Sequence, residues 1–193
     1  MDLKRICVYC SSAISAREDA VEKELRAFGR EIARRGIGLV YGGSSRGLMG
    51  ALADEVLAAG GKVTGVIPKA LEGREAAHRS LTDLRVVATM HEREQLMFEL
   101  ADAFVGFPGG FGTMEEIIEM LTWKQLGIHG KPIVIANIGG YFNPLLRQFE
   151  LAIEKKYARP EDRILFAVAE NTEAILTFLE GAPVLSRKAG DWT

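Results

Sequence analysis

The sequence has few cysteines and no long apolar run, and both shortages exclude whole classes of protein. Two cysteines in 193 residues cannot supply the disulfide framework of a small secreted domain. No segment approaches the ~20 apolar residues that a membrane-spanning helix needs, and the opening MDLKRICVYCSS lacks the apolar centre of a signal peptide. A net charge of −2 provides no basic footprint for a nucleic-acid polymer. We therefore expect a cytoplasmic protein whose partners include neither a nucleic-acid polymer nor a membrane.

The two cysteines, Cys7 and Cys10, form a C-x-x-C pattern, which in a reducing compartment can indicate a redox motif. They lie in the apolar run RICVYC, which predicts a buried strand. Side chains three residues apart on a strand point to opposite faces of the sheet. We therefore expect two small core side chains, and the redox interpretation is disfavoured.

Apolar runs rich in β-branched residues alternate with helical patterns along the chain, which is typical of βαβ units and a parallel sheet. The length fits one domain spanning residues 1–193. Continuous apolar strands are typical of a parallel sheet that is covered on both faces. The sequence predicts an α/β fold with a doubly wound, mostly parallel sheet of about seven strands, at 5–10, 37–41, 62–68, 84–89, 103–107, 131–137 and 164–169.

Helices are expected between these strands, and three of them carry sequence signals for their first turn. A Ser15–Glu18 capping box opens a helix that continues to about Arg35, Thr89 and Glu92 form a second capping box, and Asn171 caps the last helix. Further helices are expected at about 48–59, 112–127 and 143–157.

In open sheets of this kind, ligands bind beyond the carboxyl ends of the strands. Four of the predicted strand ends carry polar or glycine-rich sequence: CSS, GGSSRG, MHERE and PGGFGT. We expect these four segments to meet in one crevice.

Two of the four segments are glycine-rich loops that lead directly into helices, YGGSSRGLMG at 41–50 and PGGFGTMEE at 108–116. Glycine lets the backbone turn its N–H groups toward an anion, and a helix start adds partial positive charge. Each loop could instead be a tight strand-to-helix turn, but two of them at neighbouring strand ends favour a ligand site. Neither contains the G-K-[ST] of nucleoside triphosphatases, nor the context of a dinucleotide site. The anion that we expect is a monophosphate.

Arg93 lies on the predicted helix that follows MHERE, on the same face as Leu96, Met97 and Leu100. That face should turn toward the protein, where an unpaired guanidinium is costly. Arg93 therefore needs an anion, which is either a protein carboxylate such as Glu116 or Glu75, or a ligand.

Glu116 has two interpretations. It has the spacing of a capping box with Thr113, in which the carboxylate only satisfies a backbone N–H group. Beside a bound sugar phosphate, the same carboxylate could stabilise the oxocarbenium-like state that forms when a glycosidic bond breaks, or align the attacking water.

The helix that carries Glu116 shows a core stripe of Met114, Ile117, Ile118 and Leu121. Glu116, Met120 and Trp123 are then expected on the opposite side of the helix. A methionine and a tryptophan on that side indicate a second buried surface, most simply a subunit interface.

No metal site is evident in the sequence. His78, His91 and His129 lack metal-ligand spacing, and two cysteines do not complete a zinc set. We expect no required metal and no cofactor.

The segments GLVYGGSSRGLMGALAD, MHERE, ADAFVGFPGGFGTMEEIIE and LTWKQLGIHGKP resemble the LOG (LONELY GUY) family, the cytokinin riboside 5′-monophosphate phosphoribohydrolases, whose members have also been labelled lysine decarboxylases. The resemblance covers nearly the whole chain, and the long motif P-G-G-x-G-T-x-x-E is complete at 108–116. It implies a Rossmann-like homodimer that hydrolyses the N-glycosidic bond of adenosine 5′-monophosphates, N6-substituted or plain.

The resemblance also implies roles for individual residues. Arg93 and Glu116 correspond to the catalytic pair, and the stretch from Gly110 to Glu116 corresponds to the sugar-phosphate site. The substrate-binding positions that we expect are Gly43, Ser44, Met49, Glu75, Glu94, Gly109, Gly110, Phe111, Gly112, Thr113, Met114, Glu115 and Thr122.

The chain departs from the family pattern at Glu94, where the family normally has Lys. It also departs at Ser11, where the family usually has Gly, and at Ser44, where the family often has Gly. The reversed charge at Glu94 keeps a second hypothesis open, a non-catalytic nucleotide or cofactor carrier on the same fold. A decarboxylase would need a pyridoxal cofactor and a Schiff-base lysine. We interpret the candidates Lys62, Lys69, Lys124 and Lys131 as surface residues.

Overall fold

A single seven-stranded sheet organises the computed structural model, which describes residues 3–13, 19–73 and 77–182. The predicted capping box at Ser15 and Glu18 lies outside these residues, as does Glu75. The strand order is β4-β3-β2-β1-β5-β6-β7, and every neighbouring pair is parallel. The predicted α/β, doubly wound architecture is therefore confirmed. The strands are β1 Arg5–Tyr9, β2 Gly38–Tyr41, β3 Val63–Pro68, β4 Asp83–Val87, β5 Ala103–Gly106, β6 Ile133–Ala136 and β7 Ala167–Ala169.

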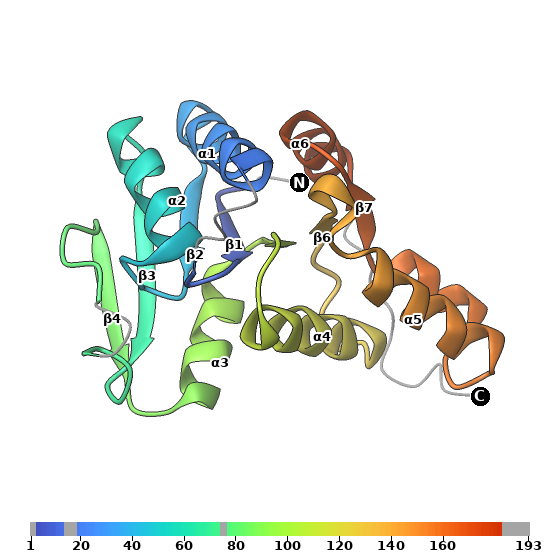
Figure 1. Cartoon of the computed structure of the whole chain (residues 1–193). Helices are drawn as coiled ribbons and strands as arrows, with labels where there is room; N and C mark the ends of the chain where they lie inside the picture. The colour runs from blue at the N-terminus through green and yellow to red at the C-terminus, as the bar shows by residue number, and fades with distance from the viewer. Residues whose placement is uncertain (1–2, 14–18, 74–76, 183–193) are drawn as a thin grey trace.

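Helices cover both faces of the sheet in three-layer fashion (Figure 1). One face is covered by α1 Asp19–Arg34, α2 Gly47–Ala58 and α6 Thr172–Gly181. The other face is covered by α3 Met90–Leu100, α4 Phe111–Gln125 and α5 Asn143–Glu154. Two 3₁₀ helices, η1 Ile138–Gly140 and η2 Pro160–Leu165, complete the fold. Because η2 opens at a proline and continues to Leu165, β7 begins three residues later than the predicted strand.

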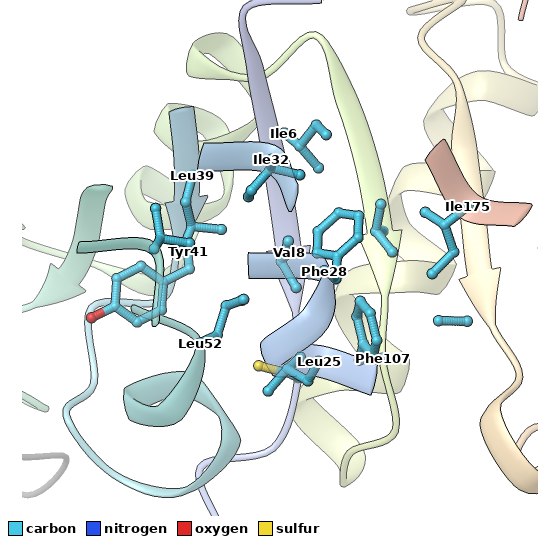
Figure 2. Close-up of a cluster of buried hydrophobic side chains, with 14 of the residues drawn as sticks. Ile6, Val8, Leu25, Phe28, Ile32, Leu39, Tyr41, Leu52, Phe107 and Ile175 are labelled. Atoms are coloured by element: carbon cyan, nitrogen blue, oxygen red, sulfur yellow. The ribbon is translucent and has the colours of Figure 1, made fainter. Parts of the chain in front are cut away.

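The core on the first face is built from α1 and the strands beneath it. Leu25, Phe28 and Ile32 of α1 lie over Val8 and Phe107, as Figure 2 shows, and all five are at most 1% exposed. Burying a side chain of this size stabilises the fold by about 1.5–3 kcal/mol. Alpha-helical spacing on α1 and strand alternation on β1 together fix this layer.

Cys7 and Cys10 belong to different layers. Cys7 packs in the core beneath α3 and α4, whereas Cys10 packs in the core beneath α1 and α2. Both are free thiols with no more than 1% of their surface exposed. The prediction that they point to opposite faces is confirmed.

Side-chain caps form where two of the sequence signals predict them. Thr89 Oγ1 accepts from the Glu92 amide at 3.1 Å, and the Glu92 carboxylate accepts from the Ala88 amide at 2.8 Å. Asn171 Oδ1 accepts from the Ala174 amide at 2.9 Å. The alternative capping box at Thr113 and Glu116 does not form, because α4 begins two residues before Thr113 with Gly110 as its N-cap.

The predicted core stripe of α4 is confirmed at Ile117 and Leu121, but the buried face is rotated away from Ile118. The buried residues are Thr113, Glu116, Ile117, Met120, Leu121 and Lys124, while Ile118 is 42% exposed. Met120 is 1% exposed inside the chain's own core. It therefore does not lie on a second face, and the half-buried Trp123 packs with its ring edge-on to Phe98, 5.1 Å between the ring centroids. The stripe was misplaced because two charged residues, Glu116 and Lys124, turn inward and hydropathy alone assigns them to solvent.

No helix in the described part of the chain is long and apolar enough to cross a membrane.

Candidate functional site

A cavity of about 400 Å³ opens where β1 and β5 lie side by side. From β1, successive strands are added outward in both directions, so this is the topological switch point at which doubly wound folds bind ligands. The size is within the range of small-molecule sites. Its walls come from three of the four predicted strand ends and from α2, and consist of residues 10–13, Met49, Met90, Arg93, 110–113, Glu115 and Glu116.

The first turn of α4 presents free backbone donors to this cavity. The amides of Phe111, Gly112 and Thr113 donate to no residue that the structure describes, and the first helical bond runs from the Met114 amide to the Gly110 carbonyl at 3.1 Å. Such amides, aligned with the helix dipole, form a ready anion site. The prediction of a cradle in PGGFGT therefore has the geometry that it requires.

The loop before α4 is held from both sides. The Ser11 amide donates to the Pro108 carbonyl at 3.3 Å, and the Tyr141 hydroxyl donates to the Gly109 carbonyl at 2.5 Å. A Cβ atom on Gly109 would lie 2.1 Å from Thr113 Oγ1 and 3.0 Å from the Ser11 amide nitrogen. Glycine at 109 therefore allows the loop to close against its neighbours, although the residue does not itself line the cavity.

The second glycine-rich loop, before α2, serves packing within the protein. The Met49 amide donates to the Ser11 carbonyl at 3.1 Å, and a Cβ on Gly47 would lie 2.2 Å from the Ser12 carbonyl carbon. Gly47 also has a φ of +59°. Here the glycine lets α2 pack against the segment after β1, which is the tight-turn alternative. Of the three positions predicted in this loop, Met49 lines the cavity and the buried Gly43 and Ser44 do not.

Arg93 and Glu116 face each other at the cavity. Arg93 Nη2 lies 3.8 Å from Glu116 Oε1, with side-chain exposures of 5% and 6%. Arg93 also donates to the Gly42 carbonyl at 3.4 Å, while its buried Nε has no hydrogen-bond partner among the described residues. Of the two anions proposed for Arg93, the protein carboxylate is present, and donor capacity remains for a ligand.

The α4 face beyond Glu116 is acidic. Burial, reinforced by the negative charge of Glu94, raises the pKa of Glu115. Burial together with Glu94 and Glu115 raises the pKa of Glu119 to about 7. An anion at the α4 N-terminus would therefore lie beside a concentration of negative charge.

Several predicted positions lie away from the cavity. Glu94 and Met114 are not among its lining residues, and Thr122 is exposed on the opposite side of α4, where its hydroxyl donates to the Ile118 carbonyl at 2.8 Å. The reason is again the rotation of α4, which carries residues 118 and 122 outward. Glu75 falls outside the described residues.

Other residues at the cavity were not singled out in the sequence. Met90, Ser12 and Ala13 line the cavity. Tyr141, which lies between η1 and α5, holds the loop before α4 through its hydrogen bond to the Gly109 carbonyl. The rule that ligands lie beyond strand ends predicts the segments containing Ser12 and Met90, but it does not rank their residues. No local pattern indicates Tyr141, because it lies 32 residues from its partner.

Of the lysines interpreted as surface residues, Lys124 is buried and Lys131 is half-buried. Lys124 is 6% exposed, and Lys131 Nζ lies 4.0 Å from the Phe98 ring centroid and donates to the Phe98 carbonyl. Neither lines the cavity, so the structure offers no Schiff-base lysine at this site among the residues described.

Comparison with known proteins places the chain in a family. A family profile described as "Possible lysine decarboxylase" matches residues 49–179. A protein from Oryza sativa subsp. japonica, named probable cytokinin riboside 5′-monophosphate phosphoribohydrolase LOGL1, is 43% identical over 91% of this chain and 78% of its own. The chain belongs to the LOG family. Another LOG relative, cytokinin riboside 5′-monophosphate phosphoribohydrolase LOG7 from Arabidopsis thaliana, is 41% identical over 92% of this chain and 81% of its own.

Solved structures share the LOG fold at lower identity. The molybdenum cofactor carrier protein of Chlamydomonas reinhardtii matches with a TM-score of 0.69 and 21% identity, over 92% of this chain and 96% of its own. The molybdenum cofactor binding protein of Rippkaea orientalis matches with a TM-score of 0.67 and 18% identity, over 93% of this chain and 97% of its own. At such identities the likeness shows the fold alone.

Proposed function

We propose that this protein hydrolyses the N-glycosidic bond of adenosine 5′-monophosphates and releases the free base and ribose 5-phosphate. The observation that carries the proposal is the buried Arg93–Glu116 pair, which lies in the same cavity as the free amides of the α4 N-terminus. Relatives that are 41–43% identical over nine-tenths of the chain are named cytokinin riboside 5′-monophosphate phosphoribohydrolases, which supports the proposal.

The cavity suggests how the substrate is held. The 5′-phosphate binds the amides of residues 111–113, where the helix dipole favours negative charge. The free donors of Arg93 reach the same anion or the ribose hydroxyls. The ribose then lies against the Glu116 carboxylate.

Glu116 acts on the anomeric carbon. As the bond between C1′ and the base nitrogen breaks, its electron pair goes to the base, and the carboxylate stabilises the positive charge that develops on the ribose. Water bonds to C1′, its proton is lost, and the base gains one. One water is consumed, and no redox partner is required.

The apolar side of the cavity fits a purine base. Met49 and Met90 line it together with Phe111, whose side chain is largely exposed at the cavity mouth. Unbranched thioethers adapt to ligands of different shape. We propose that plain AMP is a substrate along with nucleotides that carry an N6 substituent.

We also propose that the protein forms a homodimer. Apolar side chains remain exposed on α4 and just beyond it, at Ile118, Leu126 and Ile128, close in sequence to the half-buried Trp123. Met120 is not part of the proposed interface, because it is buried within one chain. Light scattering after size exclusion tests this assembly, and a monomer at micromolar concentration contradicts it. The cytoplasmic location, also a proposal, fits two free buried thiols and is tested by cell fractionation.

The decisive experiment incubates the protein with a panel of purine 5′-monophosphates, nucleosides and triphosphates and measures base release by chromatography. Hydrolysis of monophosphates, with nucleosides spared, is the expected result. If nucleotides raise the melting temperature but remain intact, the carrier alternative is correct instead.

A further inference from the structure

Three glutamates from two helices bring their carboxylates together beside the cavity. Glu94 lies on α3, and Glu115 and Glu119 lie one turn apart on α4. One carboxylate oxygen from each lies within 4.8 Å of the others. Like charges at such distances repel strongly unless a cation or protons reside among them.

The three residues differ in burial, since Glu94 is buried, Glu119 is half-buried and Glu115 is exposed. The Glu94 side chain is only 9% exposed and makes no hydrogen bond to a described residue. The His91 imidazole, on a side chain that is 98% exposed, has its Nδ1 3.7 Å from Glu94 Oε2. Glu119 contributes a fully buried Oε2 that likewise has no hydrogen-bond partner in the described chain. A buried carboxylate oxygen without a donor is costly, so Glu119 Oε2, facing the buried Glu94 carboxylate, points to a missing positive partner.

The residues that the structure describes around the cluster do not supply that partner. Glu94 and Glu119 line an open groove with two more acids, Glu92 and Glu99, and among its described lining residues only His91 is basic. The guanidinium of Arg93 is directed to Glu116 and the Gly42 carbonyl. On the other side, Glu115 lines the nucleotide cavity, so the cluster lies in the wall between groove and cavity.

We propose that Glu94, Glu115 and Glu119 form a site for a hard divalent cation such as Ca²⁺, Mn²⁺ or Mg²⁺, with water completing the coordination. Carboxylate oxygens are the preferred ligands of these ions. Oxygens on opposite sides of a Ca²⁺ ion, each about 2.4 Å from it, are separated by about 4.8 Å. The observed spacing of the three oxygens therefore accommodates calcium directly and the smaller ions after a modest contraction.

Binding of the cation does not depend on the proposed hydrolysis, because no ligand atom comes from a substrate. A consequence for catalysis does rest on the proposed function. The ion neutralises carboxylates that otherwise repel the phosphate at residues 111–113, so it should lower the KM for a nucleotide more than it changes kcat.

Manganese binding provides the direct test, because free Mn²⁺ is counted by its electron paramagnetic resonance signal. The purified full chain, first treated with EDTA and desalted, should bind one Mn²⁺ per chain with saturation, and Ca²⁺ or Mg²⁺ should displace it. Glu94→Gln and Glu119→Gln should each weaken binding by at least tenfold. Glu99→Gln, which removes the same charge from the groove but not from the cluster, is the matched control and should bind like the unmodified chain.

A second variant separates loss of the site from loss of the fold. Glu94→Lys places an ammonium group between Glu115 and Glu119, so it should abolish Mn²⁺ binding and raise the melting temperature measured in EDTA. The proposal is overturned if the unmodified chain shows no saturable binding, if Glu94→Gln binds as well as Glu99→Gln, or if the groove is closed by a second copy without any ion. Mn²⁺ binding and melting temperature are measured without base release, so failure of the proposed hydrolysis leaves this test intact.

Discussion

Arg93 and Glu116 approach each other from α3 and α4, with Nη2 3.8 Å from Oε1 and neither side chain more than 6% exposed. The separation is longer than a hydrogen bond, and Arg93 Nε has no partner among the described residues. The buried guanidinium therefore retains a free donor for a ligand beside the pair. This geometry makes the pair the first target for substitution.

Glu116→Gln should lower the turnover of AMP by at least ~100-fold, because the amide keeps the shape of the side chain but loses the charge that stabilises the developing cation. Nucleotide affinity, measured by calorimetry, should change far less than kcat. Glu150→Gln on α5 removes a surface carboxylate and should leave turnover unchanged. Equal turnover in the Glu116 and Glu150 variants would assign Glu116 a purely structural role.

Arg93→Lys should weaken AMP binding by about tenfold or more, because lysine keeps the charge but not the forked donors of the guanidinium. Arg93→Ala should in addition destabilise the fold by about 1–3 kcal/mol, since the buried Glu116 loses its cation. Denaturant titration measures the second effect independently of activity. A lysine variant with wild-type affinity would exclude direct contact between Arg93 and the nucleotide.

Two glycines of the α4 loop should respond differently to alanine. In Gly109→Ala the new methyl meets Thr113 Oγ1 at 2.1 Å, so the loop must shift and the melting temperature should fall. In Gly112→Ala no atom lies within 4 Å of the new methyl. Because Gly112 lines the cavity, this variant should melt like the unmodified chain but show a higher KM for AMP.

Gly181→Ala, at the end of α6, is the control for both, since its methyl also meets nothing and lies far in sequence from the site. If Gly112→Ala and Gly181→Ala bind AMP equally well, the phosphate does not contact the backbone at Gly112.

His129 should make the protein less stable in acid. Nε2 contacts the Met120 carbonyl at 3.0 Å and therefore carries the proton, while Nδ1 accepts from the Lys131 amide at 3.1 Å. Burial lowers the pKa of His129 to about 4 from an unfolded value of 6.5. Between these values the unfolded chain binds the extra proton and the folded chain does not, so stability falls as pH drops from about 6.5 toward 4.

The measurement is the melting temperature against pH for the unmodified chain and for His129→Gln. The variant should lose part of the slope in this window, although it can be less stable throughout. Parallel curves would show that His129 does not titrate with unfolding.

The residues near the cavity show what a sequence can and cannot predict. Arg93 was placed correctly because its apolar neighbours at helical spacing indicate the inward face, and an inward guanidinium needs an anion. The strand pattern likewise predicts the seven-stranded parallel sheet, since buried parallel strands are apolar throughout. These inferences depend on periodicity within a single element.

Errors arose where burial depends on contacts between elements. Ile118 was assigned to the core and Met120 to a second surface, because the inward turn of Glu116 and Lys124 rotates α4 against its hydropathy. The two glycine-rich loops are similar in sequence but differ in their hydrogen bonds. The amides of residues 111–113 donate to no described residue, whereas the Met49 amide donates to the Ser11 carbonyl. Sequence spacing could not reveal the three-glutamate cluster either, because Glu94 joins the other two only through the packing of α3 on α4.

The separation of the two thiols into opposite layers offers a way to follow how this molecule opens. Burial raises the pKa of both, so neither supplies the thiolate that alkylating reagents attack while the chain stays folded. Pulse labelling with iodoacetamide followed by mass spectrometry would therefore time the exposure of each layer separately. Modification of Cys10 before Cys7 would mean that the α1–α2 side detaches while the α3–α4 side, with its proposed chemistry, still holds.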